Sequence, residues 1–174
     1  VRFAAELGYG GYPGMQRALQ EMIRTRLTSV QRMEVGNDRI SSLDVLPAVL
    51  QSDIENIRST MEENSRESFN GAVDAIIKAR RIYILGVRSS AAIASFMAFY
   101  FNLIFENVKL ISTNSASEMF EQMLRVSPQD VVIAISFPRY SKRTVQAMRF
   151  SADMGATVIA ITDSPDSPLS GCAK

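Results

Sequence analysis

Four short apolar runs in the second part of the chain constrain its fold more than any other feature. They cover residues 82–86, 108–111, 130–136 and 157–162, and helical patterns separate them. Apolar runs of this length, bounded by glycine and polar turn residues, are typical of strands buried in a sheet. Strands that alternate with helices predict an α/β fold, a doubly wound parallel sheet. We expect the flavodoxin-like strand order 2-1-3-4.

The part of the chain that precedes these runs predicts helices only. Apolar residues at spacings of three and four predict helices over residues 1–7, from Pro13 to about Met33, over 43–63 and over 65–80. Gly8 is expected to end the first of them. Ser41 and Asn64 are the expected caps of the last two.

Charge is distributed unevenly over this all-helical part. Residues 1–33 contain five arginines against two glutamates, and residues 34–68 contain eight acids against three arginines. Such a shift suggests separate modules. The basic segment is suited to an anionic partner, although an ordinary solvated helix face would have the same composition.

The composition excludes several classes of site. Hydrophobic residues make up 47% of the chain and charged residues 21%, as in a soluble globular protein. The chain has no histidine, which excludes a Ser-His-Asp triad and most zinc sites. Its single cysteine fits a reducing compartment, so we expect a cytoplasmic protein. We expect no metal or other cofactor. No apolar run reaches the ~20 residues that a membrane span needs.

The first candidate site follows the first predicted strand. It consists of Gly86, Val87, Arg88, Ser89 and Ser90, and it opens a helix. A glycine permits a sharp turn, and a helix start offers backbone N–H groups, a positive dipole end and here two hydroxyls to an anion. A plain strand-to-helix turn with a serine cap would explain the same residues equally well.

The second candidate site follows the third predicted strand. Residues 136–144 (SFPRYSKRT) hold three serine or threonine hydroxyls and three cations. Ser141 and Thr144 are placed so that both can point at one bound anion, whereas Lys142 and Arg143 fit a solvated helix face. We favour ligand binding here over a structural turn. With strands 1 and 3 adjacent, the two loops are expected to face each other across the crevice at the carboxyl ends of the strands.

Two further loops have weaker signals. In residues 112–118, Ser115 is expected to cap a helix, with a ligand role as the minor alternative. Residues 163–169 are expected to form a turn. No pair of carboxylates among these loops has a spacing that suggests acid–base chemistry, so we expect no catalytic residue.

The two candidate sites resemble a known family. Ile82–Ser90 (IYILGVRSS), Ile135–Thr144 (ISFPRYSKRT) and the later segments AITDS and SPL resemble the SIS domain of RpiR/MurR transcription regulators. Enzymatic SIS domains have a shorter Ser-x-Ser-Gly-x-Thr loop in the second position. The residues that correspond to its serines and threonine are Ser136, Ser141 and Thr144.

The resemblance implies a set of ligand-binding residues. The serines and threonines hold a sugar phosphate in this family, and the remaining members of the set lie in the same loops. The predicted set is Gly86, Arg88, Ser89, Ser90, Ser136, Arg139, Ser141 and Thr144.

The start of the chain carries a second resemblance. Val1–Gln20 (VRFAAELGYGGYPGMQRALQ) is similar to the end of the family's helix-turn-helix domain. Arg2 would then contact the DNA backbone, with an ordinary helix end as the alternative. We accordingly expect a C-terminal part of a helix-turn-helix domain in residues 1–33, a linker helix in 34–64 and a C-terminally incomplete SIS domain in 65–174.

These resemblances imply a DNA-binding regulator of carbohydrate metabolism that is controlled by a phosphosugar and is not an enzyme. The partners would be operator DNA, the effector and further copies of the chain in a dimer or tetramer. The apolar helix predicted over residues 89–105 fits a subunit contact, or burial within one subunit. The alternatives are an SIS-type phosphosugar isomerase, which needs a base that the two loops lack, and a phosphosugar-binding module without a DNA function.

Overall fold

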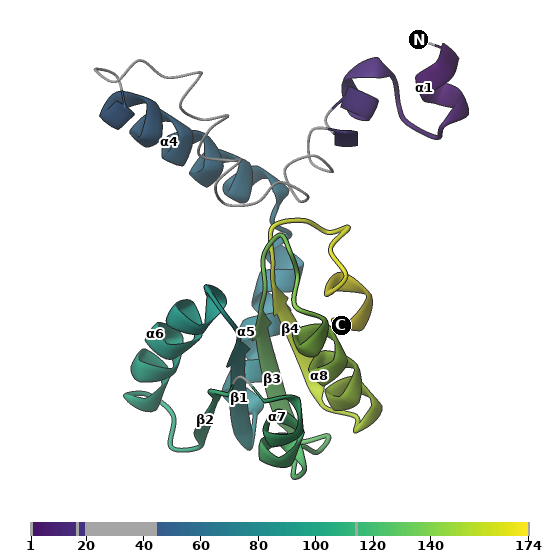
Figure 1. Cartoon of the computed structure of the whole chain (residues 1–174). Coiled ribbons are helices and arrows are strands. Elements are labelled where there is room, and N and C mark those ends of the chain that lie inside the picture. Colours follow the sequence, from purple (N-terminus) through teal and green to yellow (C-terminus); the bar gives the residue numbers. More distant parts are fainter. Residues whose placement is uncertain (1, 17, 20–44, 114, 174) are drawn as a thin grey trace. The chain divides into compact units, whose positions relative to one another are not determined.

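The computed structural model describes residues 2–16, 18–19, 45–113 and 115–173 (Figure 1). The chain divides into two compact units, residues 1–64 and residues 65–174. The helix expected to continue to Met33 and the cap expected at Ser41 involve residues outside the described ranges.

The first unit contains only helices among its described residues. Helix α1 covers Arg2–Glu6, and the chain leaves it at Gly8, which has a φ of +83°. Residues 12–16 and 18–19 are also helical, so that Pro13 lies in a first helical turn as predicted. Helix α4 covers Val45–Glu63, and none of its side chains is buried within the chain.

The second unit is built on a four-stranded sheet. The strands are β1 (Arg81–Gly86), β2 (Val108–Ile111), β3 (Asp130–Ile135) and β4 (Thr157–Ile161). Every neighbouring pair is parallel, and the order is β2-β1-β3-β4. The predicted doubly wound sheet and its strand order are therefore confirmed.

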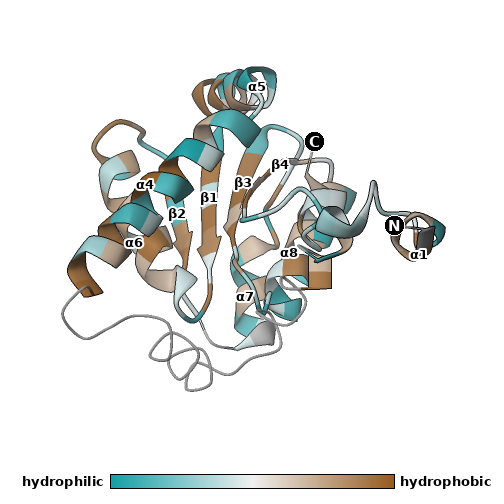
Figure 2. Cartoon of the chain, turned by 90° about the horizontal axis from the view of Figure 1, so that it is seen from above, coloured by the Kyte–Doolittle hydropathy of each residue, from teal (hydrophilic) through white to brown (hydrophobic). Residues whose placement is uncertain are grey.

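Helices cover both faces of this sheet. They are α5 (Arg66–Lys78), α6 (Ser90–Asn102), α7 (Ala116–Met123) and α8 (Lys142–Asp153), and a short 3-10 helix, η1, covers Ser170–Cys172. Alternate residues of a strand point to opposite faces. On one face Ile82 and Ile84 pack with alanines of α6, and on the other Tyr83 and Leu85 pack with methionines of α7 and α8. Figure 2 shows the apolar strands between these helices.

Two boundaries differ from the sequence prediction. The cap of α5 is Ser65 and not Asn64, because the Ser65 hydroxyl accepts a hydrogen bond from the Ser68 N–H at 3.3 Å. The Asn64 side chain instead donates to the Thr60 carbonyl at 2.8 Å. Helix α6 ends at Asn102 and not at residue 105, since the chain turns after that residue.

An ion pair between a buried carboxylate and a half-exposed arginine stabilises the amino-terminal end of the sheet. Asp130 is 1% exposed, and its two carboxylate oxygens accept hydrogen bonds from Arg80 at 3.0 and 2.9 Å. Ser127 donates to the same carboxylate from its N–H and its hydroxyl, both at 2.9 Å. Burial alone would raise the pKa of Asp130, but these hydrogen bonds and the Arg80 charge outweigh it and lower the pKa below its ordinary value.

No helix in the described ranges combines the length and the apolar character needed to cross a membrane.

Candidate functional site

Gly86, the last residue of β1, lets α6 lie unusually close to the sheet. A Cβ atom at this position would lie 2.5 Å from the Ser90 carbonyl oxygen and 2.9 Å from the Ala94 Cβ. The sequence prediction placed a sharp turn at Gly86 itself. The left-handed residue of this loop is instead Arg88, whose φ is +57°. Gly86 therefore serves close packing, and the turn falls two residues later.

Helix α6 begins without a side-chain cap. Ser89 has a helical backbone conformation, and its hydroxyl makes no capping hydrogen bond. The turn is closed by backbone bonds, from Ser90 N–H to the Val87 carbonyl at 3.2 Å and from Ala91 N–H to the Arg88 carbonyl at 3.1 Å. Ser90 is buried and Ser89 is exposed. Ser89 therefore occupies the cap position expected for a plain strand-to-helix turn, but it does not make the capping hydrogen bond of its side chain.

The second loop is closed by its own serines. The Ser136 hydroxyl accepts a hydrogen bond from the Ser141 N–H at 3.3 Å across the loop. Ser141 caps α8, since its hydroxyl accepts from the Thr144 N–H at 3.4 Å. Arg139, between them, has a φ of +67°. The two arginines at positions 88 and 139 are the only residues other than glycine with positive φ in the described part of the chain.

Thr144 holds a buried hydroxyl in the first turn of α8. The residue is 0% exposed, and its Oγ1 has no hydrogen-bonding partner among the described residues. A buried polar atom without a partner costs about 1–3 kcal/mol. An oxygen of a ligand or of a water molecule at this helix start would remove that cost.

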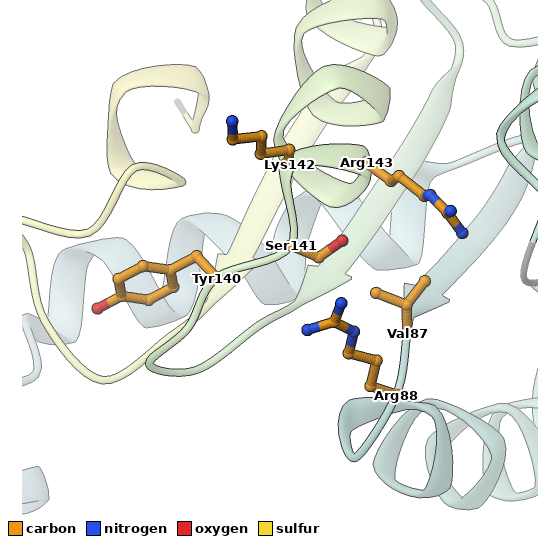
Figure 3. A pocket seen from close by; sticks show the side chains of 6 residues that line it. All are labelled: Val87, Arg88, Tyr140, Ser141, Lys142 and Arg143. Carbon is orange, nitrogen blue, oxygen red and sulfur yellow. The ribbon is translucent and has the colours of Figure 1, made fainter. Parts of the chain in front are cut away.

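The two loops line one open pocket (Figure 3). It has a volume of about 380 Å³, and the described residues that line it are Val87, Arg88, Tyr140, Ser141, Lys142 and Arg143. The prediction that the two loops face each other is confirmed. The pocket lies where β1 and β3, the strands that precede the loops, end side by side.

The hydroxyls of this site are arranged to donate. A hydroxyl can accept hydrogen bonds and can donate one. Ser136 and Ser141 both accept from backbone N–H groups, so each can still offer its O–H to an acceptor. The start of α8 adds the positive end of a helix dipole. Together these groups favour an anion such as phosphate over a cation.

The predicted residues occupy different positions at this site. Arg88 and Ser141 line the pocket, while Ser89, Ser90, Ser136, Arg139 and Thr144 lie in its loops or first helical turns without being part of the lining. The sequence prediction included Val87 and Tyr140 in the two candidate loops but not in the set of ligand-binding residues, and it interpreted Lys142 and Arg143 as fitting a solvated helix face. The available signal for all four was their place in these loops, beside Arg88 or Ser141.

Tyr140 connects the second loop to the end of β4. Its hydroxyl donates to the Asp163 carboxylate at 2.8 Å, and Thr162 donates to the same oxygen at 3.2 Å. Tyr140, Arg139 and Arg143 have additional interactions. This contact fixes the loop on the side away from β1.

The two weaker loops are structural as far as their contacts show. Ser115 caps α7 by accepting from the Glu118 N–H at 3.5 Å, as predicted, and the Thr113 hydroxyl donates to the Glu118 carboxylate. Residues 163–169 form a turn in which Ser167 is buried, and its hydroxyl has no partner among the described residues. The described ranges contain no group of three or more potential metal ligands. Arg2 lies in α1, and its contact with DNA stays a prediction.

Comparison with protein families identifies the second unit. Residues 75–174 match the model of the SIS domain. Over 170 residues the chain is 24% identical to an HTH-type transcriptional regulator of Clostridium perfringens, with 97% of this chain and 60% of the relative covered. The chain therefore spans about 60% of the length of that relative.

Solved structures show the same relationship. The sugar isomerase domain of an RpiR transcription factor from Sphaerobacter thermophilus superposes with a TM-score of 0.70 at 28% identity, covering 75% of this chain and 73% of that chain. The NanR protein of Vibrio vulnificus complexed with ManNAc-6P gives a TM-score of 0.66 at 19% identity, covering 100% of this chain and 59% of that chain. Other similar structures are described as candidate phosphosugar isomerases.

Proposed function

The chain belongs to the SIS domain family, and from this premise we propose that it is part of an RpiR-type transcription regulator controlled by a phosphosugar. Curated relatives named HTH-type transcriptional regulators align with 93–99% of the chain, and so with both of its units. The structure of one similar protein, NanR, holds ManNAc-6P. Both observations support a sensor joined to a DNA-binding domain.

The start of α8 is the observation that carries the proposal. The Thr144 Oγ1 is fully buried without a partner among the described residues, and the Thr144 N–H donates to the Ser141 hydroxyl at 3.4 Å. A phosphate in the pocket would accept a hydrogen bond from the Ser141 hydroxyl and would meet the positive end of the helix dipole. It would also accept one from the Thr144 hydroxyl if the first turn of α8 moved to expose that atom. Ser136 supports the site indirectly, since its hydroxyl holds the Ser141 N–H. The sugar would extend from the phosphate toward the Gly86–Ser90 loop.

The DNA-binding part of the proposal concerns the first unit. We assign residues 1–33 to the end of a helix-turn-helix domain, with Arg2 beside a DNA phosphate, and residues 34–64 to a linker helix. Binding of the effector would change the affinity of the regulator for its operator. Such a regulator acts on DNA in the cytoplasm.

A homodimer is part of the same proposal. Helix α6 exposes large apolar side chains, with Phe96 at 65% and Phe99 at 63% exposure, and Leu103, which directly follows the helix, is 70% exposed. Phe99 and Tyr100 meet edge to face, with their ring centroids 5.3 Å apart. Exposed apolar patches of this kind are typical of surfaces that contact another protein chain. We propose that a second copy covers this face.

An SIS-type isomerase is the second candidate function, favoured only by the similar structures described as candidate isomerases. Sugar isomerisation needs a base that removes a proton from carbon. The described lining of the pocket contains three cations and a serine but no carboxylate, and the chain has no histidine. Incubation with a panel of phosphosugars and analysis of the products would distinguish the two functions.

Ligand binding is the first test of the sensor proposal. Thermal shifts of the full-length protein are measured with phosphosugars and with their unphosphorylated parents. A ligand at 100 times its Kd should stabilise the fold by about 2.7 kcal/mol. Only phosphorylated sugars should stabilise the protein, and the variant Ser141→Ala/Thr144→Val should lose the effect. Ser52→Ala, an exposed change in α4, is the control.

Operator binding is the second test. Affinity for operator DNA is measured by fluorescence anisotropy with and without the best ligand. The proposal requires the ligand to change this affinity in the wild-type protein and in Ser52→Ala, but not in the Ser141→Ala/Thr144→Val variant. An affinity that is the same with and without ligand would refute control by the effector.

A further inference from the structure

The pocket carries more positive charge than a single phosphate needs. Its described lining includes Arg88, Lys142 and Arg143 and no carboxylate. Lys142 and Arg143 lie on α8, the helix whose start we assign to the phosphate, while Arg88 lies on the opposite loop. In Figure 3 the Arg88 guanidinium extends into the space between the loops, and the Lys142 side chain points away from it.

The backbone of Arg88 is strained. A φ of +57° is the left-handed conformation, which is unfavourable for a residue with a Cβ. A glycine would adopt this conformation without that cost. The turn itself is closed by backbone hydrogen bonds, which any residue can make. Strained residues of this kind cluster at functional sites, so the side chain of Arg88 is the feature to explain.

The phosphate does not account for Arg88. A phosphate monoester carries a charge of about −1.5 to −2 at neutral pH. The start of α8 offers about half a positive charge from its dipole. Its first turn carries two cations, Lys142 and Arg143, and its cap, Ser141, adds a hydroxyl. These groups all belong to α8 or to its cap, and together they carry enough positive charge to balance the phosphate. Arg88 therefore remains for another part of the ligand.

We propose that Arg88 binds a second anionic group, so that the effector is a sugar phosphate with a further acidic group. Phosphorylated sugar acids and sugar bisphosphates are the two classes with this chemistry. A guanidinium presents parallel N–H groups that match a carboxylate or a phosphate. The pocket volume of about 380 Å³ falls within the range of small-ligand sites, which leaves space for a sugar beyond the phosphate. This inference rests on the proposed function of the same pocket.

The test uses pairs of ligands that differ in the second acidic group. Glucose 6-phosphate is compared with 6-phosphogluconate, and fructose 6-phosphate with fructose 1,6-bisphosphate. Calorimetric titration of the full-length protein gives each Kd. At least one acidic member should bind about tenfold or more tightly than its partner, because a charge-assisted hydrogen bond is worth that factor. The pair with the larger ratio identifies the class.

Arg88→Gly is the decisive variant because it removes the guanidinium and also the backbone strain, so that the fold is retained. It should abolish the preference for the acidic ligand and leave binding of the monophosphate within about threefold, a range below the effect of one charged hydrogen bond. Lys142→Ala removes a cation of the same pocket whose side chain points away from Arg88, and it should keep the preference.

The possible failures are distinguishable. Equal loss of affinity for both members of a pair in Arg88→Gly would mean that Arg88 binds the phosphate, which overturns the inference but leaves the proposed function intact. Equal binding of both members by the wild-type protein would overturn it as well. If no phosphosugar binds the wild-type protein, the proposed function itself fails, and the inference with it.

Discussion

The contact between Gly86 and the start of α6 permits a quantitative prediction for Gly86→Ala. The new Cβ would lie 2.5 Å from the Ser90 carbonyl oxygen, whereas ordinary contacts begin at 3.4 Å. The helix start would therefore have to move by about 0.9 Å. The nearest atom belongs to the backbone, so no side chain can rotate to relieve the clash. Overpacking of this kind costs about 1–3 kcal/mol, and we expect the upper end of that range.

The effect is measured by thermal and urea unfolding followed by circular dichroism. A loss of about 3 kcal/mol lowers the Tm of a domain of this size by about 10 °C or more. Because the displaced segment carries Ser89 and Ser90, phosphosugar binding should weaken as well. Gly86→Ala with wild-type Tm and wild-type affinity would refute the argument that Gly86 is required for close packing.

Gly71→Ala is the matched control for this prediction. Gly71 lies inside α5, and a Cβ there would have no neighbouring atom within 4 Å. Alanine stabilises a helix interior by about 0.5–1 kcal/mol relative to glycine. The same substitution should therefore raise the Tm at this position and lower it at Gly86. A decrease at both positions would show that the sign is not set by the local space.

Three further substitutions test other parts of the structure. Asp130→Asn should destabilise the protein at neutral pH by about 1–3 kcal/mol, since it loses charged hydrogen bonds. Because the pKa of Asp130 is lowered in the folded state, the stabilisation by the ionised carboxylate is complete above the ordinary value of 3.8 and is lost as the pH falls below that value. Urea titrations should therefore show the difference in stability between the variant and the wild type shrinking at low pH. Tyr140→Phe, which removes the hydrogen bond to Asp163, should cost about 1 kcal/mol in a thermal melt and weaken ligand binding, and an unchanged Kd would separate this contact from the site. Ser167→Ala should leave the Tm unchanged or raise it, since it removes a buried hydroxyl that has no partner among the described residues; a clear decrease would indicate a partner outside them.

The sheet was predictable from sequence because its information is local and repeated. Each strand is a short apolar run ended by a polar or glycine residue, as at Ile82–Gly86 and Asp130–Ser136. The cap at Ser115 was predictable for the same reason, since a serine three residues before the matching N–H is a local pattern, and the same pattern occurs at Ser141. Two adjacent candidates, Asn64 and Ser65, defeat this rule because sequence alone does not decide which side chain turns back toward the helix start.

The details of the site were less predictable because they depend on distances between elements. The role of Gly86 follows from the separation of β1 and α6, which no local pattern encodes. The left-handed conformations of Arg88 and Arg139 occur at residues that ordinarily avoid them. Lys142 and Arg143 have the composition of a solvated helix face, and only the arrangement of the two loops places them around a pocket.

The arrangement of the helices explains why a ligand in this pocket would act on the whole second unit. Helix α6 packs on one face of the sheet, against Ile82 and Ile84, and α8 packs on the other, against the opposite set of strand residues. The loop before α6 and the first turn of α8 line the same pocket because β1 and β3 are neighbours that end together. A ligand whose phosphate is held by Ser141 and whose second acidic group is held by Arg88 would therefore join the two helical layers across the strand ends. Each layer would lose that connection if the ligand left, so occupancy of the pocket should stabilise the unit as a whole and not only the loops that touch the ligand.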